Sequence, residues 1–320
     1  MQVIVSVSRF NPTDNNGKYW QDYNLEIEDN STVLDALIKI REEIDGSLAM
    51  RCSCRSAICG SCAMRVNGHA RLACNTKLAD MTDDAGMVKI EPMTNLPLIK
   101  DLVIDQKMFW DKVKQVSPWI QSEGPEPKGE YVASNESMNH LAGVMACIMC
   151  GACVSDCSAL EVDKNFIGPA ALAKAYRFVD DPRDSKSVER LGMLNGYGGI
   201  WDCTRCYECV EVCPKGVAPM DRIMALREEA INVGYDDSMG ARHADAFSDI
   251  VGDSGWLDEL RLPIKTVGIF NLPALLNFAP VGLRALVKGK MPAIFHHNVP
   301  NVQNVRNLFK KIRNDNNNDD

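Results

Sequence analysis

The 320-residue sequence lacks a long apolar run, an excess of basic residues and a glycine-rich nucleotide motif. The long uncharged stretch of residues 266–283 is broken by Asn271, Pro273, Asn277 and Pro280, so we expect no membrane-spanning helix. The opening residues MQVIVSVSRF have neither the basic start nor the apolar core of a signal peptide, so we expect no export signal there. A formal net charge of −8 gives no electrostatic footprint for nucleic acid. Without a G-x-G-x-x-G motif, nothing predicts a dinucleotide-binding domain.

Cysteine is the residue type that stands out, with 13 in a chain of otherwise ordinary globular composition. Disulfide-rich scaffolds are short secreted chains, and this sequence has neither property. An odd number of cysteines also leaves one thiol over from any complete pairing. Metal binding is therefore the better explanation of the cysteines. The five histidines show no ligand spacing, and we assign them no cofactor role.

The sequence patterns predict an α+β protein in three parts, residues 1–105, 106–235 and 236–320. In the first part, alternation predicts strands at 2–9, 19–27 and 88–91, and Ser31 or Thr32 caps a helix whose apolar positions run to Ile44. Residues 50–76 are predicted to be a cysteine-dense loop.

The second part is predicted to be helical after a connecting loop. Residues 117–135 are rich in proline and glycine and predict that loop. Gly168-Pro169 and Pro219 each open a helix, and Gly234 ends the second of these. The third part, the C-terminal extension, is predicted to hold short helices and a disordered tail at 314–320.

The first cysteine set is Cys54, Cys59 and Cys62 in C-x4-C-x2-C spacing, followed by Cys74. This is the spacing of plant-type [2Fe–2S] sites, in which a distant fourth cysteine completes the ligands. Small loop residues let backbone N–H groups approach the sulfurs: Ala57, Gly60 and Ser61. Three arginines are expected to offset the negative charge of the cluster: Arg51, Arg55 and Arg65. Four thiolates also suit Zn²⁺, the alternative for this set, and Cys52 is left as an unligated thiol.

Two further sets follow the C-x2-C-x2-C-x3-C run of bacterial ferredoxins. In this run, the first three cysteines hold one cluster, while the fourth sits on the departing helix and faces the neighbouring cluster. We therefore expect one [4Fe–4S] cluster to be held by Cys147, Cys150, Cys153 and Cys213. We expect the other to be held by Cys157, Cys203, Cys206 and Cys209.

Three clusters in one chain form a path for single electrons. One plant-type set followed by two bacterial-type sets resembles the iron–sulfur subunits of succinate dehydrogenases and fumarate reductases. The resembling segments are 54–68 with 72–74, 147–157 and 203–219, and 33–40 is also similar to the family. The resemblance covers residues 1–235. It implies a β-grasp plant-type ferredoxin domain followed by an all-α bacterial-ferredoxin-type domain.

In that family, the subunit relays electrons between an FAD-containing flavoprotein, which interconverts succinate and fumarate, and a membrane quinone. The resemblance implies that the [2Fe–2S] site faces the flavoprotein and that the Cys203–Cys209 set lies at the far end. It also implies that this chain carries no catalytic residue. The expected location is peripheral on the inner membrane, at the cytoplasmic face, or at the periplasmic face if the flavoprotein is exported with it.

Three positions differ from the best-known members of the family. A residue other than cysteine commonly stands at the Cys206 position and gives a [3Fe–4S] centre. Cys206 makes [4Fe–4S] the expected cluster here, with [3Fe–4S] as the alternative. Ser158 begins the segment SALEV where a quinone-contacting tryptophan is expected, and Thr204 stands where a histidine often follows. With the long extension, these features resemble the class whose membrane partner is a cysteine-rich subunit, which includes the methylmenaquinol:fumarate reductases.

The extension combines the apolar segment 266–283 with basic residues that follow it: Arg284, Lys288, Lys290, Lys310, Lys311 and Arg313. This combination suits docking to a membrane-associated partner or to lipid headgroups, with packing on the helical domain as the alternative. Other functions for the whole chain are a subunit of a thiol-dependent fumarate reductase or of another flavin-linked dehydrogenase, a stand-alone ferredoxin-like carrier, and a zinc-binding interaction protein.

Overall fold

The computed structural model describes residues 1–14, 17–268, 270–293 and 297–316. It divides the chain into two compact units, residues 1–229 and 230–320. The division falls inside helix α11 (Pro219–Asn232), whereas the sequence predicted a boundary after residue 235. A continuous helix shows no change of pattern at such a boundary. The first unit holds residues 1–105 and most of the second predicted part, up to Glu229.

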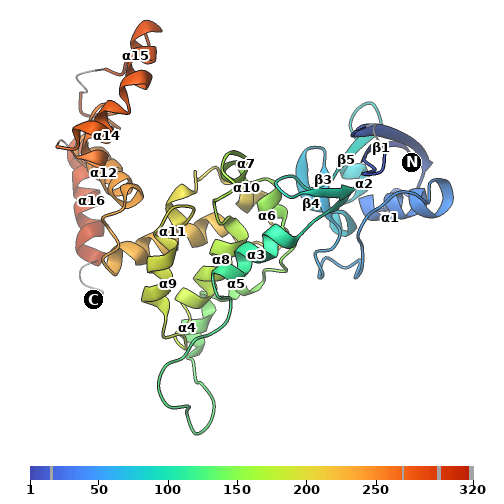
Figure 1. Cartoon of the computed structure of the whole chain (residues 1–320), viewed down its shortest axis with the longest axis horizontal. Helices are drawn as coiled ribbons and strands as arrows, with labels where there is room; N and C mark the ends of the chain where they lie inside the picture. Colours follow the sequence, from blue (N-terminus) through green and yellow to red (C-terminus); the bar gives the residue numbers. More distant parts are fainter. Residues whose placement is uncertain (15–16, 269, 294–296, 317–320) are drawn as a thin grey trace. The chain divides into compact units, whose positions relative to one another are not determined.

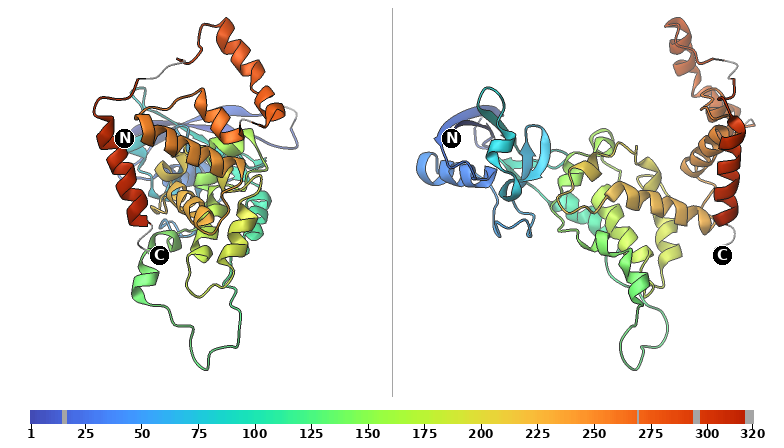
Figure 2. Two further views of the ribbon diagram at one scale, coloured as in Figure 1. Left: turned by 90° about the vertical axis from the view of Figure 1, so that its left-hand side faces the viewer. Right: turned by 180° about the vertical axis from the view of Figure 1, so that it is seen from behind.

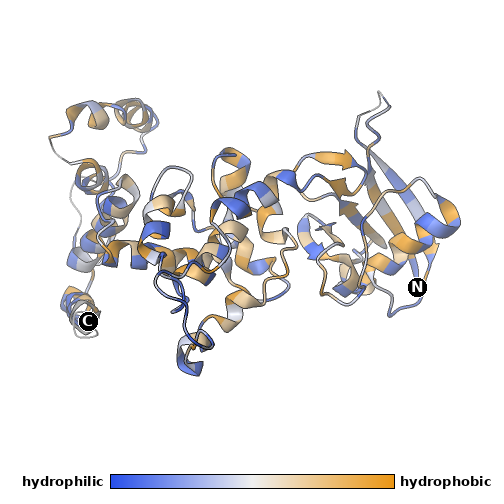
Figure 3. Ribbon diagram, turned by 60° about the horizontal axis from the view of Figure 1, so that its bottom comes forward, coloured by the Kyte–Doolittle hydropathy of each residue, from blue (hydrophilic) through white to orange (hydrophobic). Residues whose placement is uncertain are grey.

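A five-stranded sheet in the order β2-β1-β5-β3-β4 forms the N-terminal part of the first unit (Figure 1). Its strands are β1 (Gln2–Arg9), β2 (Tyr19–Glu26), β3 (Ala63–Val66), β4 (His69–Leu72) and β5 (Met87–Glu91). The central pair β1–β5 is parallel, and the other pairs are antiparallel. Apolar and polar segments alternate along the ribbons of this part, as Figure 3 shows.

Helix α1 (Val33–Lys39) lies beside the sheet and continues as a π-helical turn, Ile40–Ile44. Thr32 is its N-cap: the Thr32 hydroxyl accepts from the backbone N–H of Asp35, whose carboxylate accepts from the backbone N–H of Thr32. The helix buries Val33, Leu34 and Leu37. The predicted strands and the predicted cap are confirmed.

The prediction of a loop over residues 50–76 was wrong in its second half, where β3 and β4 form a hairpin. Asn67 and Gly68 join the two strands with φ of 49° and 84°, the left-handed pair that a type I′ turn requires. Five apolar side chains of the hairpin are buried: Ala63, Met64, Val66, Ala70 and Leu72. Asn-Gly between alternating apolar residues is a hairpin signal, which the dense cysteines obscured. Short helical turns follow at Ala73–Asn75 and at α2 (Leu78–Met81).

A short connection leads from the sheet to the helical part. The two-stranded ribbon β6 (Leu98–Lys100) and β7 (Val103–Ile104) precedes helix α3 (Lys107–Gln115). The predicted connecting loop follows and extends away from the helices in Figures 1 and 2. Its start is anchored by buried Arg190, which donates to the carbonyls of Val116, Ser117 and Trp119 and pairs with Asp184.

Short helices surround α8 (Pro169–Val179), which begins at the predicted proline and contacts α3, α5, α6 and α9. The others are α4 (Asn135–Asn139), α5 (Ala142–Met145), α6 (Ala152–Ser155), α7 (Ser158–Val162), α9 (Ser187–Leu194), a 3-10 turn at Ile200–Asp202, α10 (Glu208–Glu211) and α11. Pro219 opens α11, and Gly234 follows its end with φ of 92°.

The second unit is helical. Helix α12 (Met239–Ser254) packs against α13 (Arg261–Val267) and α16 (Val302–Asn316), with α14 (Leu272–Leu276) and α15 (Ala279–Val287) between them in sequence. Helix α16 extends to Asn316, into the tail that was predicted to be disordered, and residues 317–320 lie outside the described residues. In the part of the chain that the structure describes, no helix is both long and apolar enough to cross a bilayer.

Candidate metal centres

The first cysteine set lies on a loop that directs backbone N–H groups at sulfur. Cys54 Sγ accepts from the N–H groups of Ser56, Ile58 and Cys59 at 3.4, 3.4 and 3.2 Å. The N–H of Ala57 donates to Cys74 Sγ at 3.3 Å. Arg55 and Ala57 adopt left-handed φ values of 56° and 55°. Alternating right- and left-handed residues turn successive N–H groups inward, a concavity that suits anionic sulfur.

The thiols of this set differ in their proton affinity. A hydrogen bond from the Ser61 hydroxyl, with help from backbone N–H groups, lowers the pKa of Cys59 to about 6. Burial raises the pKa of Cys62 to about 12, and the charge of neighbouring Cys74 acts in the same direction. Cys59 is exposed and Cys62 is buried, so the loop joins a surface thiolate to a covered thiol.

The fourth cysteine of each dicluster run lies near the cysteines of the other run. One cavity is lined by Cys147, Cys150, Cys153 and Cys213, although Cys213 is distant in sequence. The N–H of Val217 donates to Cys213 Sγ at 3.4 Å, which holds that thiol in place. Burial raises the pKa of Cys150 to about 11 and also raises the pKa of Cys153.

Cys157 belongs with the other set in space. Burial raises its pKa, and the neighbouring charges of Cys203 and Cys206 add to the shift. Burial likewise raises the pKa of Cys209 to about 12, with Cys203 and Cys157 as charged neighbours. Contrary to the prediction, the fourth cysteine does not sit on the departing helix. Helix α6 ends at Ser155, and Cys157 is the N-cap residue of α7.

The two C-x2-C-x2-C loops repeat one backbone conformation. The residues on either side of the middle cysteine are left-handed in both loops. Their φ values are 56° and 83° at Met149 and Gly151, and 57° and 66° at Arg205 and Tyr207. In each loop the third cysteine then lies on a short helix, α6 or α10. The two loops therefore present their thiols in the same way.

Sequence reasoning missed buried Arg227, a cation that contacts the backbone of the third set. Its guanidinium donates to the carbonyls of Ile200, Trp201 and Cys203 at 2.9, 3.2 and 2.9 Å. Burial lowers the pKa of Arg227 to about 10, while the charge of Cys203 opposes that shift. Arg227 lies in α11 outside any recognisable motif, so no sequence signal distinguishes it from the exposed arginines.

Two positions noted for their difference from the family surround Cys206. Burial of the Cys206 thiol acts to raise its pKa, but hydrogen bonds from Ser158 and from the backbone of Glu208 outweigh this and lower it. The Thr204 hydroxyl also bonds to this thiol and lies 3.5 Å from the Ser158 hydroxyl. Ser158 and Thr204 therefore favour the thiolate form that metal binding requires.

Arg65, which was expected to offset the charge of the first cluster, has partners that the sequence did not predict. Its Nε donates to the Gly68 carbonyl at 3.0 Å and lies 3.7 Å from Asp156. Arg65 thus links the hairpin to α6. Arg51 does line a pocket that contains Cys59, at the edge of the first set.

Several contacts bring the first set against the second within the first unit. Asp156 accepts from the N–H of Ala70 at 2.8 Å, and the Asn95 side chain donates to the carbonyls of Val154, Ser155 and Cys157 at 3.0 Å each. Gly60 also lies against the second set: a Cβ added there would lie 2.9 Å from the Cα and Cβ atoms of Cys150. Cys59 and Cys62 therefore lie on a loop that packs directly on the second set.

The thiols fit iron–sulfur clusters by number and by surroundings. Backbone N–H donors are aimed at sulfur in the first set, and four thiols line one cavity at the second. Among the described residues, no group of three or more His, Cys, Asp or Glu side chains is placed to hold a single metal ion. Fold and thiols together define a multi-cluster iron–sulfur protein.

Comparison with known proteins agrees with the assignment to iron–sulfur proteins. A 2Fe-2S iron-sulfur cluster binding domain matches residues 4–111, and a 4Fe-4S dicluster domain matches residues 143–217. The fumarate reductase iron-sulfur subunit of Mycobacterium tuberculosis is 38% identical over 71% of this chain and 92% of its own length. The 8-methylmenaquinol:fumarate reductase iron-sulfur subunit of Wolinella succinogenes is 33% identical over 80% of this chain and 82% of its own length. The succinate dehydrogenase iron-sulfur subunit of Coxiella burnetii is 36% identical over 71% of this chain and 96% of its own length.

A solved structure, the Mycobacterium smegmatis Sdh1 complex in the apo form, contains a chain that matches with a TM-score of 0.64 and 27% identity. The match covers 74% of this chain and 98% of that one. The chain belongs to the family of iron–sulfur subunits of succinate dehydrogenases and fumarate reductases. It is an electron-transfer subunit of an oxidoreductase, with one 2Fe-2S domain and one 4Fe-4S dicluster domain. The resemblance inferred from cysteine spacing is confirmed.

Proposed function

We propose that this chain passes single electrons between an FAD-containing flavoprotein and a membrane-associated subunit that is cysteine-rich or binds quinone. The N-terminal sheet with α1 is assigned to the β-grasp fold of plant-type ferredoxins. The complex is assigned to the inner membrane, at the cytoplasmic face, or at the periplasmic face if the flavoprotein is exported. The match to the Wolinella subunit, which extends further along this chain than the other two, supports the class with a cysteine-rich partner.

The ligands are proposed set by set. Cys54, Cys59, Cys62 and Cys74 hold a [2Fe–2S] cluster, Cys147, Cys150, Cys153 and Cys213 hold a [4Fe–4S] cluster, and Cys157, Cys203, Cys206 and Cys209 hold a second one. When bound, such clusters accept and donate one electron at a time. The chain's own residues bind them, cover them and set their electrostatic surroundings. No residue here is assigned to substrate chemistry.

One observation carries the proposal: Cys213 shares a cavity with Cys147, Cys150 and Cys153. The dicluster run requires this arrangement, because the fourth cysteine of each run binds the cluster of the other run. It is tested by Cys213→Ser with Cys52→Ser as the matched control, since Cys52 lies outside the three sets. Iron and labile sulfide are counted in anaerobically prepared chain, and electron paramagnetic resonance (EPR) spectra are recorded after oxidation and after reduction. We expect Cys213→Ser to alter the first [4Fe–4S] signal and Cys52→Ser to alter none.

Cys206 decides the type of the second dicluster centre. With four thiolates, the freshly oxidised protein shows no [3Fe–4S] signal, and Cys206→Ser generates one. A [3Fe–4S] signal in the fresh wild-type protein would mean that Cys206 is idle, and the conventional quinone-linked arrangement would replace this proposal. Copurification of a succinate-active flavoprotein from native extract tests the partner. A monomeric peak alone would favour a free carrier.

A further inference from the structure

The segment from Leu260 to Arg313 has an unusual charge composition. It contains 9 of the chain's 35 Lys and Arg residues and none of its 43 Asp and Glu residues. The rest of the chain contains the other 26 basic residues and all 43 acidic residues, so the negative charge of the protein lies entirely outside this segment. A positive segment on a negative protein points to a negatively charged binding surface.

The middle of this segment has an apolar surface that the second unit leaves uncovered. The buried part of α13 ends at Thr266 and Val267, and no described residue from 268 to 293 is buried. Phe270 is 98% exposed, and Leu272 and Leu276 are 65% and 68% exposed. Exposed apolar residues gathered in one segment mark an interaction site.

Helix α15 separates apolar from basic residues. Leu283, Leu286 and Val287 stand at i, i+3 and i+4, so they share one face of the helix, and they are 63%, 63% and 80% exposed. Arg284 and Lys288 stand four residues apart and share a neighbouring face. A helix of nine residues is marginal alone in water, so a surface that covers the apolar face of α15 would stabilise it.

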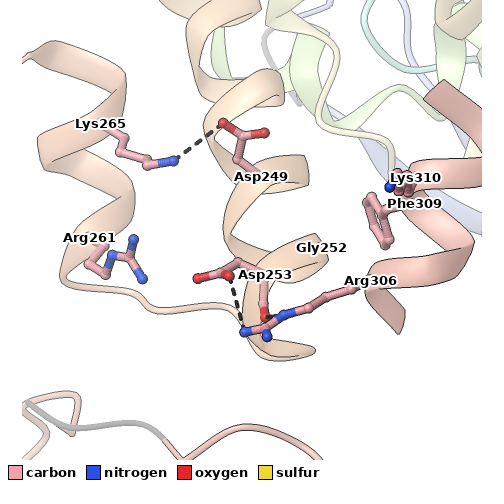
Figure 4. Close-up of a pocket in the computed structure, with 8 residues that line it drawn as sticks. All are labelled: Asp249, Gly252, Asp253, Arg261, Lys265, Arg306, Phe309 and Lys310. Carbon is pink, nitrogen blue, oxygen red and sulfur yellow. Dashed lines mark hydrogen bonds and ion pairs between the residues drawn. The ribbon is translucent and has the colours of Figure 1, made fainter. Parts of the chain in front are cut away.

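Basic side chains also gather where α12, α13 and α16 meet. A pocket there is lined by four cations, Arg261, Lys265, Arg306 and Lys310, and by two carboxylates (Figure 4). Lys265 pairs with Asp249 and Arg306 with Asp253, each at 3.3 Å. The cations outnumber the carboxylates, so this pocket also favours an anion such as a phosphate headgroup.

We propose that residues 270–291, named here the docking segment, bind the anionic surface of a lipid bilayer. The apolar side chains of α14 and α15 enter the headgroup boundary, and Arg284, Lys288 and Lys290 contact lipid phosphates. Lysine is depleted at protein–protein interfaces, whereas interfacial membrane helices combine Leu and Phe on one face with Lys and Arg on the other. The composition therefore favours lipid over a protein groove. This inference rests on the membrane association in the proposed function and names the segment responsible.

The test is co-sedimentation of the full chain, with its clusters, with vesicles of known lipids. We expect binding to a mixture of phosphatidylcholine and phosphatidylglycerol, weak binding to phosphatidylcholine alone, and loss of binding in high salt. Replacing Arg284, Lys288 and Lys290 by Gln should weaken binding about 100-fold, at ~1 kcal/mol for each basic residue near an anionic surface. The matched control, Lys77→Gln with Lys114→Gln and Lys128→Gln, makes the same charge change elsewhere and should leave binding unchanged.

The apolar contribution is tested separately by Leu283→Ser with Leu286→Ser, and circular dichroism confirms that the variants fold. Equal binding of both lipid mixtures, or equal loss in the control, would overturn the proposal. Binding only to vesicles that contain the membrane subunit would assign the docking segment to a protein partner instead. Cluster EPR signals are recorded on the same samples. Normal signals without vesicle binding would refute the lipid inference and leave the proposed electron-transfer function intact.

Discussion

The close approach of Gly60 to Cys150 predicts what a single methyl group does there. Gly60 has φ of +71°, and an added Cβ would lie 2.9 Å from two atoms of Cys150. A left-handed backbone costs an alanine about 1–2 kcal/mol. Relieving the clash adds about 1–3 kcal/mol, the typical cost of overpacking, because Cys150 Cα is backbone and cannot swing aside. Gly60→Ala therefore combines a conformational cost with a steric one.

Gly86 provides the control that separates the two costs. Its φ is +76°, and nothing lies within 4 Å of an added Cβ, so Gly86→Ala carries the conformational cost alone. The assay is thermal unfolding of the cluster-loaded chain, in which 1 kcal/mol corresponds to about 2–4 °C for a unit of this size. We expect Gly60→Ala to lower the melting temperature by a further ~2–12 °C relative to Gly86→Ala.

A second readout addresses the distance between the first two centres. Moving the Cys59–Cys62 loop away from Cys150 should weaken the magnetic interaction between the [2Fe–2S] signal and its neighbour in Gly60→Ala, and not in Gly86→Ala. Equal melting temperatures and equal spectra in the two variants would show that Gly60 is not needed for packing on Cys150.

Three other substitutions test single contacts. Asn95→Ala removes a side-chain donor that three carbonyls of the 154–157 turn share, although each keeps another hydrogen bond. Hydrogen exchange should report that turn as destabilised by about 0.5–1.5 kcal/mol, and unchanged protection would contradict this. Ser158→Ala removes a donor to Cys206, so a redox titration followed by EPR should give a lower midpoint potential for that centre, with Ser158→Thr close to wild type. Arg227→Gln removes the buried cation beside Cys203 and should lower the same potential, while the [2Fe–2S] potential stays constant as an internal control.

Local sequence patterns predicted the features that depend on neighbouring residues. Cysteine spacing predicted the three sets that are proposed as ligands, because a loop that surrounds a cluster needs fixed intervals between its thiols. Thr32 and Pro169 marked the starts of helices for equally local reasons, a side-chain cap and a preset φ. The exchange of Cys157 and Cys213 was also predicted, since it follows from the dicluster run itself.

Features that depend on tertiary contacts were not predictable. Nothing near Arg227 in the sequence shows that it is buried under the third set, and nothing near Gly60 shows that Cys150 lies against it. The ion pair of Arg65 was not predictable for the same reason, because its partner Asp156 is distant in sequence. The β3–β4 hairpin is a different case: the Asn67-Gly68 signal was present and was outweighed by the surrounding cysteines.

The exchange of fourth cysteines also has a topological consequence. In the proposed assignment, each dicluster centre is a covalent cross-link that joins two stretches of chain roughly 50 residues apart, as a disulfide does. In the chain-entropy treatment of disulfides, a closed loop of that length disfavours the unfolded chain by about 4 kcal/mol. Two such loops share the segment from Cys157 to Cys203, so opening one leaves the other closed. The helices between them are then held by the same bonds that hold the iron, and chelation of the iron should melt α8 and α9 together.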